Sequence, residues 1–341
     1  MILPTIWFFI WGLLWAVFFM TDGFDFGVGM LLPFLGKTEA EKQAMAHSIG
    51  PFWDGNEVWL ITAGGATFAA FPTVYAVMFS SLYTPLMLIL FSLILRGVSF
   101  EFRNKIGDPL WTNVWDAFIF IGSVVPSLLF GVAFANIFRG IPIDAQGIYH
   151  GTLFTLLNLY GIAGGLLFII LFLQHGSIWL ALKTENELHD RVAKFSRIIW
   201  PILLVFALFF LVTSWQMTNL LQNYLEHPVL FIFLLLPVLA LLMIRVFLQL
   251  KAYFKAWLAS AVTILGTTFF AIIGLFPNMY PSSLDPNHSL TAYNSASSPL
   301  TLTIMLVVVL IFVPIVIAYQ IWVYYLFKGK LKDSDLLEEA Y

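Results

Sequence analysis

"MILPTIWFFIWGLLWAVFFMTDGFDFGVGM", residues 1–30, opens with twenty residues that carry no charge and then places Asp22 and Asp25 three positions apart. An apolar run of this length can cross a bilayer as a helix, which needs about 17–25 residues. Carboxyl groups inside a membrane helix are costly and commonly mark a functional site. The stretch therefore predicts a membrane helix with two acids, and the rest of the chain decides what surrounds them.

The composition of the whole chain is that of an integral membrane protein. Of its 341 residues, 60% are hydrophobic and 10% are charged. Soluble domains carry about 25% charged residues, because their surfaces face water. The apolar runs lack the short alternating pattern of barrel strands. We expect a single integral membrane domain, residues 1–341, with an all-α polytopic fold. No cleavage site follows a basic region at the start, so the first run is interpreted as a retained helix.

Several classes of function are excluded by what the sequence lacks. There are no cysteines, which rules out disulfides and thiolate metal sites. The net charge of −3 is too small to indicate a nucleic-acid partner. No glycine-rich phosphate loop is present, so ATP-driven transport has no support.

Apolar runs separated by polar or proline-bearing breaks predict a bundle of about nine membrane helices. Their expected ranges are 4–34, 51–71, 74–98, 111–138, 151–181, 196–222, 228–248, 254–276 and 300–327. The weakest break is at Pro72, where a tight turn divides a run about twice as long as one crossing. The longest connection outside the membrane, residues 276–298, is expected to be an ordered loop or a partner contact.

The orientation follows from lysine and arginine, which stay on the cytoplasmic side of a membrane. With the N-terminus outside and the C-terminus cytoplasmic, Arg139 is the one basic residue of the 16 that falls outside. The final inner group consists of Lys328, Lys330 and Lys332.

In this topology the acids within or beside the spans gather toward the cytoplasmic side. A carboxyl group shielded from water can take up and release a proton near neutral pH, which a proton route requires. The predicted route consists of Asp25, Asp54 and Glu57, with Asp22, Asp116 and Glu101 in supporting positions. The alternative, which fits Asp116 and Glu101 best, is that the acids cap helices or form ion pairs. The basic residues available for such pairs are Arg96, Arg103 and Lys105.

The histidines and glycines give weaker indications of function than the acids do. Of the six histidines, His175 alone falls within an apolar span, so we expect this chain to bind no haem or metal of its own. Gly23 and Gly27 are spaced for close helix packing, and Gly64 and Gly65 suggest the same for the second helix.

Four stretches of the chain resemble a known family. These are "TDGFDFGVGMLLPFLG", "GPFWDGNEVWLITAGGATFAAFPTVYA", "NVWDAFIFIGSVVPSLLFGVAF" and the loop "FPNMYPSS" with "SLTAYNSASSPLTL" after it. They closely resemble subunit II of the cytochrome bd-type quinol oxidases, and the similarity extends over essentially the whole chain.

The resemblance implies a haem-free subunit of nine helices that pairs pseudo-symmetrically with a haem-bearing subunit I in the bacterial cytoplasmic membrane. Subunit I is expected to hold two haems b and one haem d, and the pair to oxidise quinol and reduce dioxygen to water without pumping protons. The family's subunit II acids fall on Asp25 and Asp54, whereas Glu57 stands where some members have an amide. The resemblance leaves open which quinone is used, and whether a structural quinone or a small single-helix accessory subunit joins the complex.

Two other interpretations remain open at this point. The chain could be a purely structural partner of the oxidase with no proton role. It could also be a proton-coupled secondary transporter, although transporters tend to place acids near the midplane in repeated halves. Here the acids gather on one side, and no internal repeat is visible.

Overall fold

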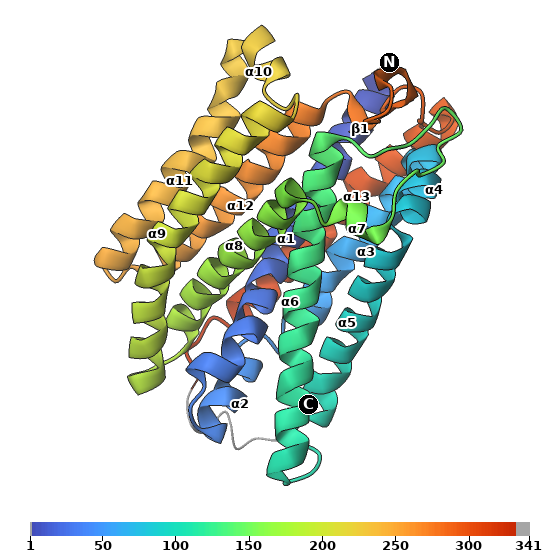
Figure 1. Cartoon of the computed structure of the whole chain (residues 1–341). Coiled ribbons are helices and arrows are strands. Elements are labelled where there is room, and N and C mark those ends of the chain that lie inside the picture. The colour runs from blue at the N-terminus through green and yellow to red at the C-terminus, as the bar shows by residue number, and fades with distance from the viewer. Residues whose placement is uncertain (1, 332–341) are drawn as a thin grey trace.

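The structure, a computed structural model, describes residues 2–331 and is built almost entirely of helices. Nine of them are at least 18 residues long and run between the two ends of the molecule (Figure 1). They are α1 (Ile2–Leu35), α3 (Trp53–Ala70), α5 (Tyr83–Phe102), α6 (Pro109–Arg139), α8 (Leu159–Lys183), α9 (Asn186–Met217), α11 (Ile232–Gln249), α12 (Tyr253–Leu275) and α13 (Pro299–Leu326). The predicted all-α membrane fold is confirmed. Residue 1 and the last ten positions of the predicted domain, 332–341, which include Lys332, lie outside the described residues.

Short elements join the long helices. They are α2 (Glu39–His47), α4 (Pro72–Ser81), α7 (Leu153–Leu156), α10 (Gln222–Glu226), two 3-10 turns, η1 (Pro228–Phe231) and η2 (Pro286–His288), and the strands β1 (Asn278–Tyr280) and β2 (Leu290–Thr291). The two strands pair antiparallel, so the connection expected to be an ordered loop is ordered.

Eight helices within residues 2–331 are long and apolar enough to cross a membrane. The remaining long helix, α3, is less apolar than these eight, because polar residues occupy its first turns, as the sequence "WDGNEVW" shows. Nine crossings therefore stay a prediction, and the orientation of the chain stays one as well.

Several predicted boundaries are wrong in instructive ways. The span predicted at 74–98 is interrupted at Leu82, because Pro85 has no N–H to donate to the carbonyl of Ser81 four residues earlier. The span predicted at 151–181 begins only at residue 159, where the Asn158 side chain caps α8 by accepting from the Gly161 N–H. The span predicted at 196–222 begins ten residues earlier, at Asn186. The turn at Pro72 is confirmed.

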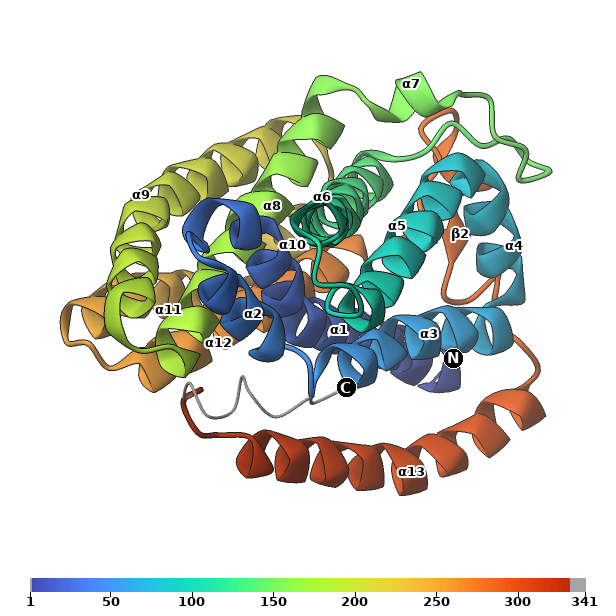
Figure 2. The same cartoon turned by 90° about the horizontal axis from the view of Figure 1, so that it is seen from below.

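Helix α1 lies at the centre of the bundle and contacts α3, α6, α8 and α12 (Figures 1 and 2). Helices α3, α5 and α6 lie on one side of it, and α8, α9, α11 and α12 form the other side. A Cβ on Gly27 would lie 2.0 Å from the Phe172 carbonyl oxygen, so the backbones of α1 and α8 touch at this glycine. Gly64 and Gly65 were expected to pack closely in the same way, but they do not, because a Cβ at either position would meet nothing within 4 Å.

Helix α13 lies along the edge of the bundle, as Figure 2 shows from below. Leu302 is its one buried residue among those described. Its polar contacts with the bundle lie toward its two ends. Near the first, the Trp7 indole N–H donates to the Leu302 carbonyl at 3.0 Å, and near the second, Gln320 accepts from the Trp59 indole N–H at 3.0 Å and donates to the Gly55 carbonyl at 3.0 Å. The centre of α13 is therefore an exposed apolar helix attached through a few polar side chains.

Candidate functional site

Asp22 and Asp25 project from consecutive turns of α1 into the interior of the bundle. Neither residue has any exposed surface. The sequence places them on one helical face, and burial of that face against α3 and α5 brings both acids into the protein rather than into lipid.

Arg96 of α5 is the cation of this cluster. Its Nη2 lies 2.7 Å from Asp22 Oδ1 and 2.5 Å from Glu57 Oε1, and its guanidinium carbon lies 4.2 Å from the centre of the Phe26 ring. The Arg96 side chain is fully buried, whereas the Glu57 side chain is 20% exposed. Ion pairing, the alternative considered from the sequence, therefore applies to Asp22 and Glu57.

Asp25 has an amide partner instead of a cation. Asn56 Nδ2 donates to Asp25 Oδ2 at 2.7 Å and to the Thr21 carbonyl at 3.2 Å. The Tyr324 hydroxyl, from α13, donates to Asn56 Oδ1 at 3.1 Å. Asn56 and Tyr324 were missed at the sequence level. Asn56 had a signal, because it lies between Asp54 and Glu57 in one motif, but Tyr324 had none.

The charges of the cluster do not balance. The cluster holds three carboxyl groups, on Asp22, Asp25 and Glu57, but one guanidinium group, on Arg96, which pairs with Asp22 and Glu57 alone. Asp22 Oδ2, Asp25 Oδ1 and two nitrogens of Arg96 are buried without a hydrogen-bond partner among the described residues. An unpaired charge is expensive to bury, so a carboxyl group without a cation is easier to bury when it holds a proton. The arrangement is thus suited to hold a proton.

Asp54 lies apart from this cluster on the open face of α3. It is exposed and makes no ion pair or hydrogen bond within residues 2–331. It heads a stripe of exposed residues at helical spacing, which we call the α3 stripe. The stripe consists of Asp54, Val58, Ile61, Gly65 and Phe68.

Asp116 and Glu101 lie outside the cluster as well. Asp116 accepts from Arg103 Nε at 2.6 Å and from Lys42 Nζ at 2.8 Å. Arg103 also pairs with Glu39 at 2.6 Å, so this second group of charges fastens α2 to α5 and α6. Glu101 is exposed near the end of α5 and has no ion pair in the part of the chain that the structure describes.

Apolar side chains close the cluster on the side of α2. The buried residues below the two aspartates are Phe24, Val28, Leu31, Leu32, Met45 and Ile49. The partly exposed Glu57 and the exposed Asp54 lie on the α3 side instead. The acids of this region that have exposed surface therefore belong to α3 rather than to α1.

His175 lies well inside α8 and is fully buried. Its Nδ1 is 2.5 Å from Ser260 Oγ and its Nε2 is 3.0 Å from the Met20 carbonyl oxygen. Both ring nitrogens are thus engaged by the protein, and this histidine does not fit a ligand to haem iron. Residues 2–331 also contain no group of three acidic or histidine side chains that could hold a metal ion.

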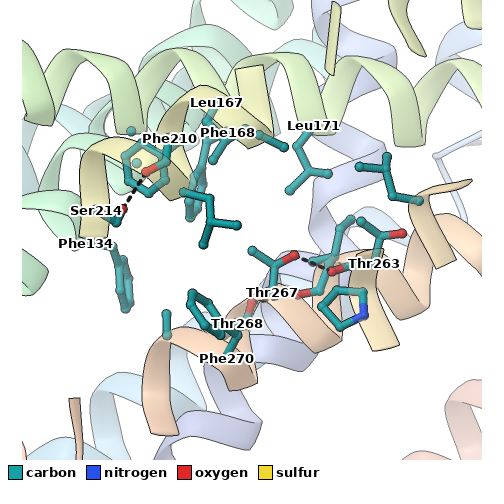
Figure 3. Close-up of a pocket in the computed structure, with 18 of the residues that line it drawn as sticks. Phe134, Leu167, Phe168, Leu171, Phe210, Ser214, Thr263, Thr267, Thr268 and Phe270 are labelled. Atoms are coloured by element: carbon teal, nitrogen blue, oxygen red, sulfur yellow. Dashed lines mark hydrogen bonds between the residues drawn. The ribbon is translucent and has the colours of Figure 1, made fainter. Parts of the chain in front are cut away.

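An apolar pocket of about 150 Å³ lies between α6 and the helices α8, α9, α11 and α12. Figure 3 shows Leu167, Phe168 and Leu171 of α8 on one side of it and the threonines of α12 on the other. The Thr263, Thr267 and Thr268 hydroxyls donate to carbonyls of their own helix. The pocket is therefore suited to an apolar group rather than to a polar one.

These features describe a helical membrane protein with a buried cluster of carboxyl groups around one arginine. The chain belongs to the family described as cytochrome bd terminal oxidase subunit II, whose model matches residues 3–327. It is accordingly a subunit of a quinol-oxidising respiratory oxidoreductase complex.

Similar proteins extend over nearly the full chain. A "Probable cytochrome oxidase subunit 2" of Haemophilus influenzae is 40% identical over 97% of this chain and 96% of its own length. The "Cytochrome bd ubiquinol oxidase subunit 2" of Bacillus subtilis is 37% identical over 98% of each chain. The "Cytochrome bd-I ubiquinol oxidase subunit 2" of Escherichia coli K12 is 37% identical over 98% of this chain and 97% of its own.

The fold has a solved counterpart. A chain of the bd oxidase from Geobacillus thermodenitrificans superposes with a TM-score of 0.80 over 96% of this chain and 99% of the other, at 14% sequence identity. At that identity, the likeness supports the fold alone.

Proposed function

We propose that this chain is the haem-free subunit II of a bacterial quinol:dioxygen oxidoreductase in the cytoplasmic membrane. It stabilises the haem-bearing subunit I and supplies a proton-uptake path from the cytoplasm for the reduction of dioxygen to water. The haems of subunit I, two haems b and one haem d, supply the electron-transfer and oxygen chemistry. The observation that carries the proposal is the excess of buried carboxyl groups around Arg96.

The proposed path begins at Asp54 and ends at Asp25. Asp54 and Glu57 are one helical turn apart on α3, and Glu57 is the partly exposed member of the buried cluster. Arg96 joins Glu57 to Asp22, and Asp22 interacts with Asp25. Arg96 itself stays charged and holds the carboxyl groups in place, so protons pass between the acids and any water among them.

The α3 stripe is the proposed contact surface for subunit I. A carboxyl group that faced lipid from this position would be costly, and Asp54 is in line with four other exposed residues of α3. Gly64 and Gly65 leave the α3 backbone open, as a closely packed partner helix requires. Delivery of protons would then be lateral, from the end of the path at Asp25 into the partner.

Substitution of the two key acids tests the proton path. We expect Asp25→Asn and Asp54→Asn to slow oxygen consumption at least tenfold in an assembled complex with a normal haem spectrum, since one general acid–base group commonly contributes about 10²–10⁴-fold. Glu187→Gln is the matched control, because its side chain is 90% exposed and lies 3.7 Å from its nearest cation. Unchanged turnover in both aspartate variants, or loss of haem in both, would favour a purely structural subunit.

We also propose that the apolar pocket takes part of the tail of a structural quinone. Its volume of about 150 Å³ suits a few isoprenoid carbons rather than a whole quinone. Ala271→Phe should fill it, and solvent extraction of the purified complex should then recover less quinone than from the unmodified complex. Equal recovery would rule the pocket out as a quinone site.

A further inference from the structure

The Tyr324 side chain reaches the buried cluster from α13, a helix that otherwise makes little contact with that cluster. Its ring centre lies 4.6 Å from that of Phe52, and its hydroxyl donates to Asn56 Oδ1 at 3.1 Å. Two anchors hold this end of α13 in place. Gln320 bonds to α3, and Lys183 Nζ donates to the Phe327 carbonyl and, at 3.3 Å, to that of Gly329.

The orientation of the Asn56 amide follows from its neighbours. Its Nδ2 has two hydrogens, and both are used, one by the Thr21 carbonyl and one by Asp25 Oδ2. A flipped amide would place Oδ1 against the Thr21 carbonyl, where two acceptors cannot bond, and would turn the NH2 group toward the Tyr324 hydroxyl. The Thr21 carbonyl therefore selects this orientation, and the Tyr324 hydroxyl supplies the donor that Asn56 Oδ1 then accepts.

This orientation makes the two oxygens of Asp25 unequal. Oδ2 accepts from Asn56 at 2.7 Å, while Oδ1 is buried without a partner among the described residues. Asp22 Oδ2 is unpartnered in the same way. A proton on Asp25 is accordingly carried by Oδ1, because Oδ2 already accepts a hydrogen bond from the amide.

Building on the proton path proposed above, we propose that Tyr324 is a positioning residue that acts through Asn56 on Asp25. It keeps Asp25 Oδ2 occupied as an acceptor, so that Oδ1 is the oxygen that takes up and releases the proton. The charged and titratable groups around Asp25 are Asp22 on α1, Arg96 on α5 with Glu57 of α3 behind it, and Tyr324 itself on α13. Proton loading in the interior is thereby linked to the docking of α13.

Tyr324→Phe in the assembled complex tests the proposal, because it keeps the stacked ring and removes only the hydroxyl. Asn56 Oδ1 then loses its donor, and the hydrogen bond from the Asn56 amide to Asp25 Oδ2 weakens. We expect the infrared C=O stretching band of the protonated carboxyl group to shift and turnover to fall roughly two- to tenfold, the equivalent of one hydrogen bond. The pH profile of turnover should move to higher pH, because a weaker hydrogen bond from the amide stabilises the ionised carboxyl group of Asp25 less.

Tyr160→Phe is the matched control, because it also removes a buried hydroxyl. This hydroxyl lies 2.7 Å from Ser214 Oγ, between α8 and α9. Asn56→Ala provides a second route to the same result and should shift the same band. If Tyr324→Phe and Asn56→Ala both match Tyr160→Phe in band position and pH profile, the positioning role is wrong.

Asp25→Asn separates this inference from the proposed function. The carboxyl band should disappear in that variant. If the band persists, Asp25 is not the protonated group and the proposed path fails. If the band disappears there but stays unmoved in Tyr324→Phe, the path stands and only the role of Tyr324 is overturned.

Discussion

Arg96 and Asp22 form an ion pair across 2.7 Å in which neither side chain has any exposed surface. Because Arg96 also holds Glu57, it balances part of the charge that α1 and α3 bring into the interior. A buried pair of this kind contributes little net free energy when intact, but removing one partner leaves the other charge without compensation.

We therefore expect Arg96→Leu to lower the free energy of unfolding of the complex by about 3–5 kcal/mol. Denaturant titration in detergent, followed by the haem spectrum, measures the change. Lys105→Leu is the matched control, since Lys105 is exposed and forms no ion pair within residues 2–331, and it should change stability by less than about 0.5 kcal/mol. Equal losses of unfolding free energy in the two variants would contradict the role of Arg96 as the cation of the buried cluster.

Gly27 should tolerate no side chain. A Cβ at this position would meet the Phe172 carbonyl oxygen at 2.0 Å and the Gly176 Cα at 2.8 Å, and both belong to the backbone of α8. We expect Gly27→Ala to destabilise the complex by at least about 1–3 kcal/mol, the usual cost of overpacking. Thermal unfolding measures the effect, and Gly50→Ala is the control, because its Cβ would come no closer than 3.6 Å to another residue. A wild-type melting temperature for Gly27→Ala would show that α1 and α8 do not pack as described.

Lys183 is expected to hold the C-terminal end of α13. Its Nζ donates to carbonyls beyond the last turn of α13 and lies 4.9 Å from the centre of the Trp179 ring. Lys183→Met should therefore cost about 0.5–2 kcal/mol, the range for a cation at a helix C-terminus. Amide hydrogen exchange across residues 318–331 should become faster. Lys330→Met is the control, because Lys330 is 48% exposed and 3.9 Å from its partner, and it should leave the exchange unchanged. The same protection in both variants would argue against the anchor.

The connection before α8 should respond to acid. The hydrogen bond from His150 lowers the pKa of Asp144 below its usual 3.8, and the amides of Gln146 and Ile148 also donate to Asp144. Because the pKa is lower in the folded state, the contribution is complete above the unfolded pKa and is lost as pH falls through the folded value. We expect Gln146 and Ile148 to lose hydrogen-exchange protection below about pH 4, relative to amides in the helices, and Asp144→Asn to remove this pH dependence. Protection that stays constant into strong acid would contradict this contact.

Part of the site could be predicted from the sequence because it depends on local rules. Asp22 and Asp25 in an apolar run had to be either functional or paired, and Arg96 was among the cations available for pairing. The contact between Tyr324 and Asn56 could not be predicted, since it joins residues 268 positions apart and Tyr324 looks like any aromatic residue near a membrane surface. The protonation states of the acids remain predictions.

The fold, like the site, could be predicted from the sequence only in part. Hydropathy located the long helices, because a helix that crosses a bilayer needs about 17–25 predominantly apolar residues. It missed α2, which is nine residues long, polar and held by a capping box at Thr38. It also missed the interruption at Leu82, which depends on the position of a single proline rather than on polarity.

The three ion pairs of α2 reach α5, α6 and α9, so this short helix ties both halves of the bundle together at one end. The opposite end, where β1, β2 and the loop after α12 lie (Figure 1), is tied as well, because the Ile141 N–H after α6 donates to the Pro281 carbonyl and the hydroxyls of Ser81 and Tyr280 bond to each other. We therefore expect little rocking of one half against the other, and a geometry around Asp22 and Asp25 that such motion leaves largely undisturbed.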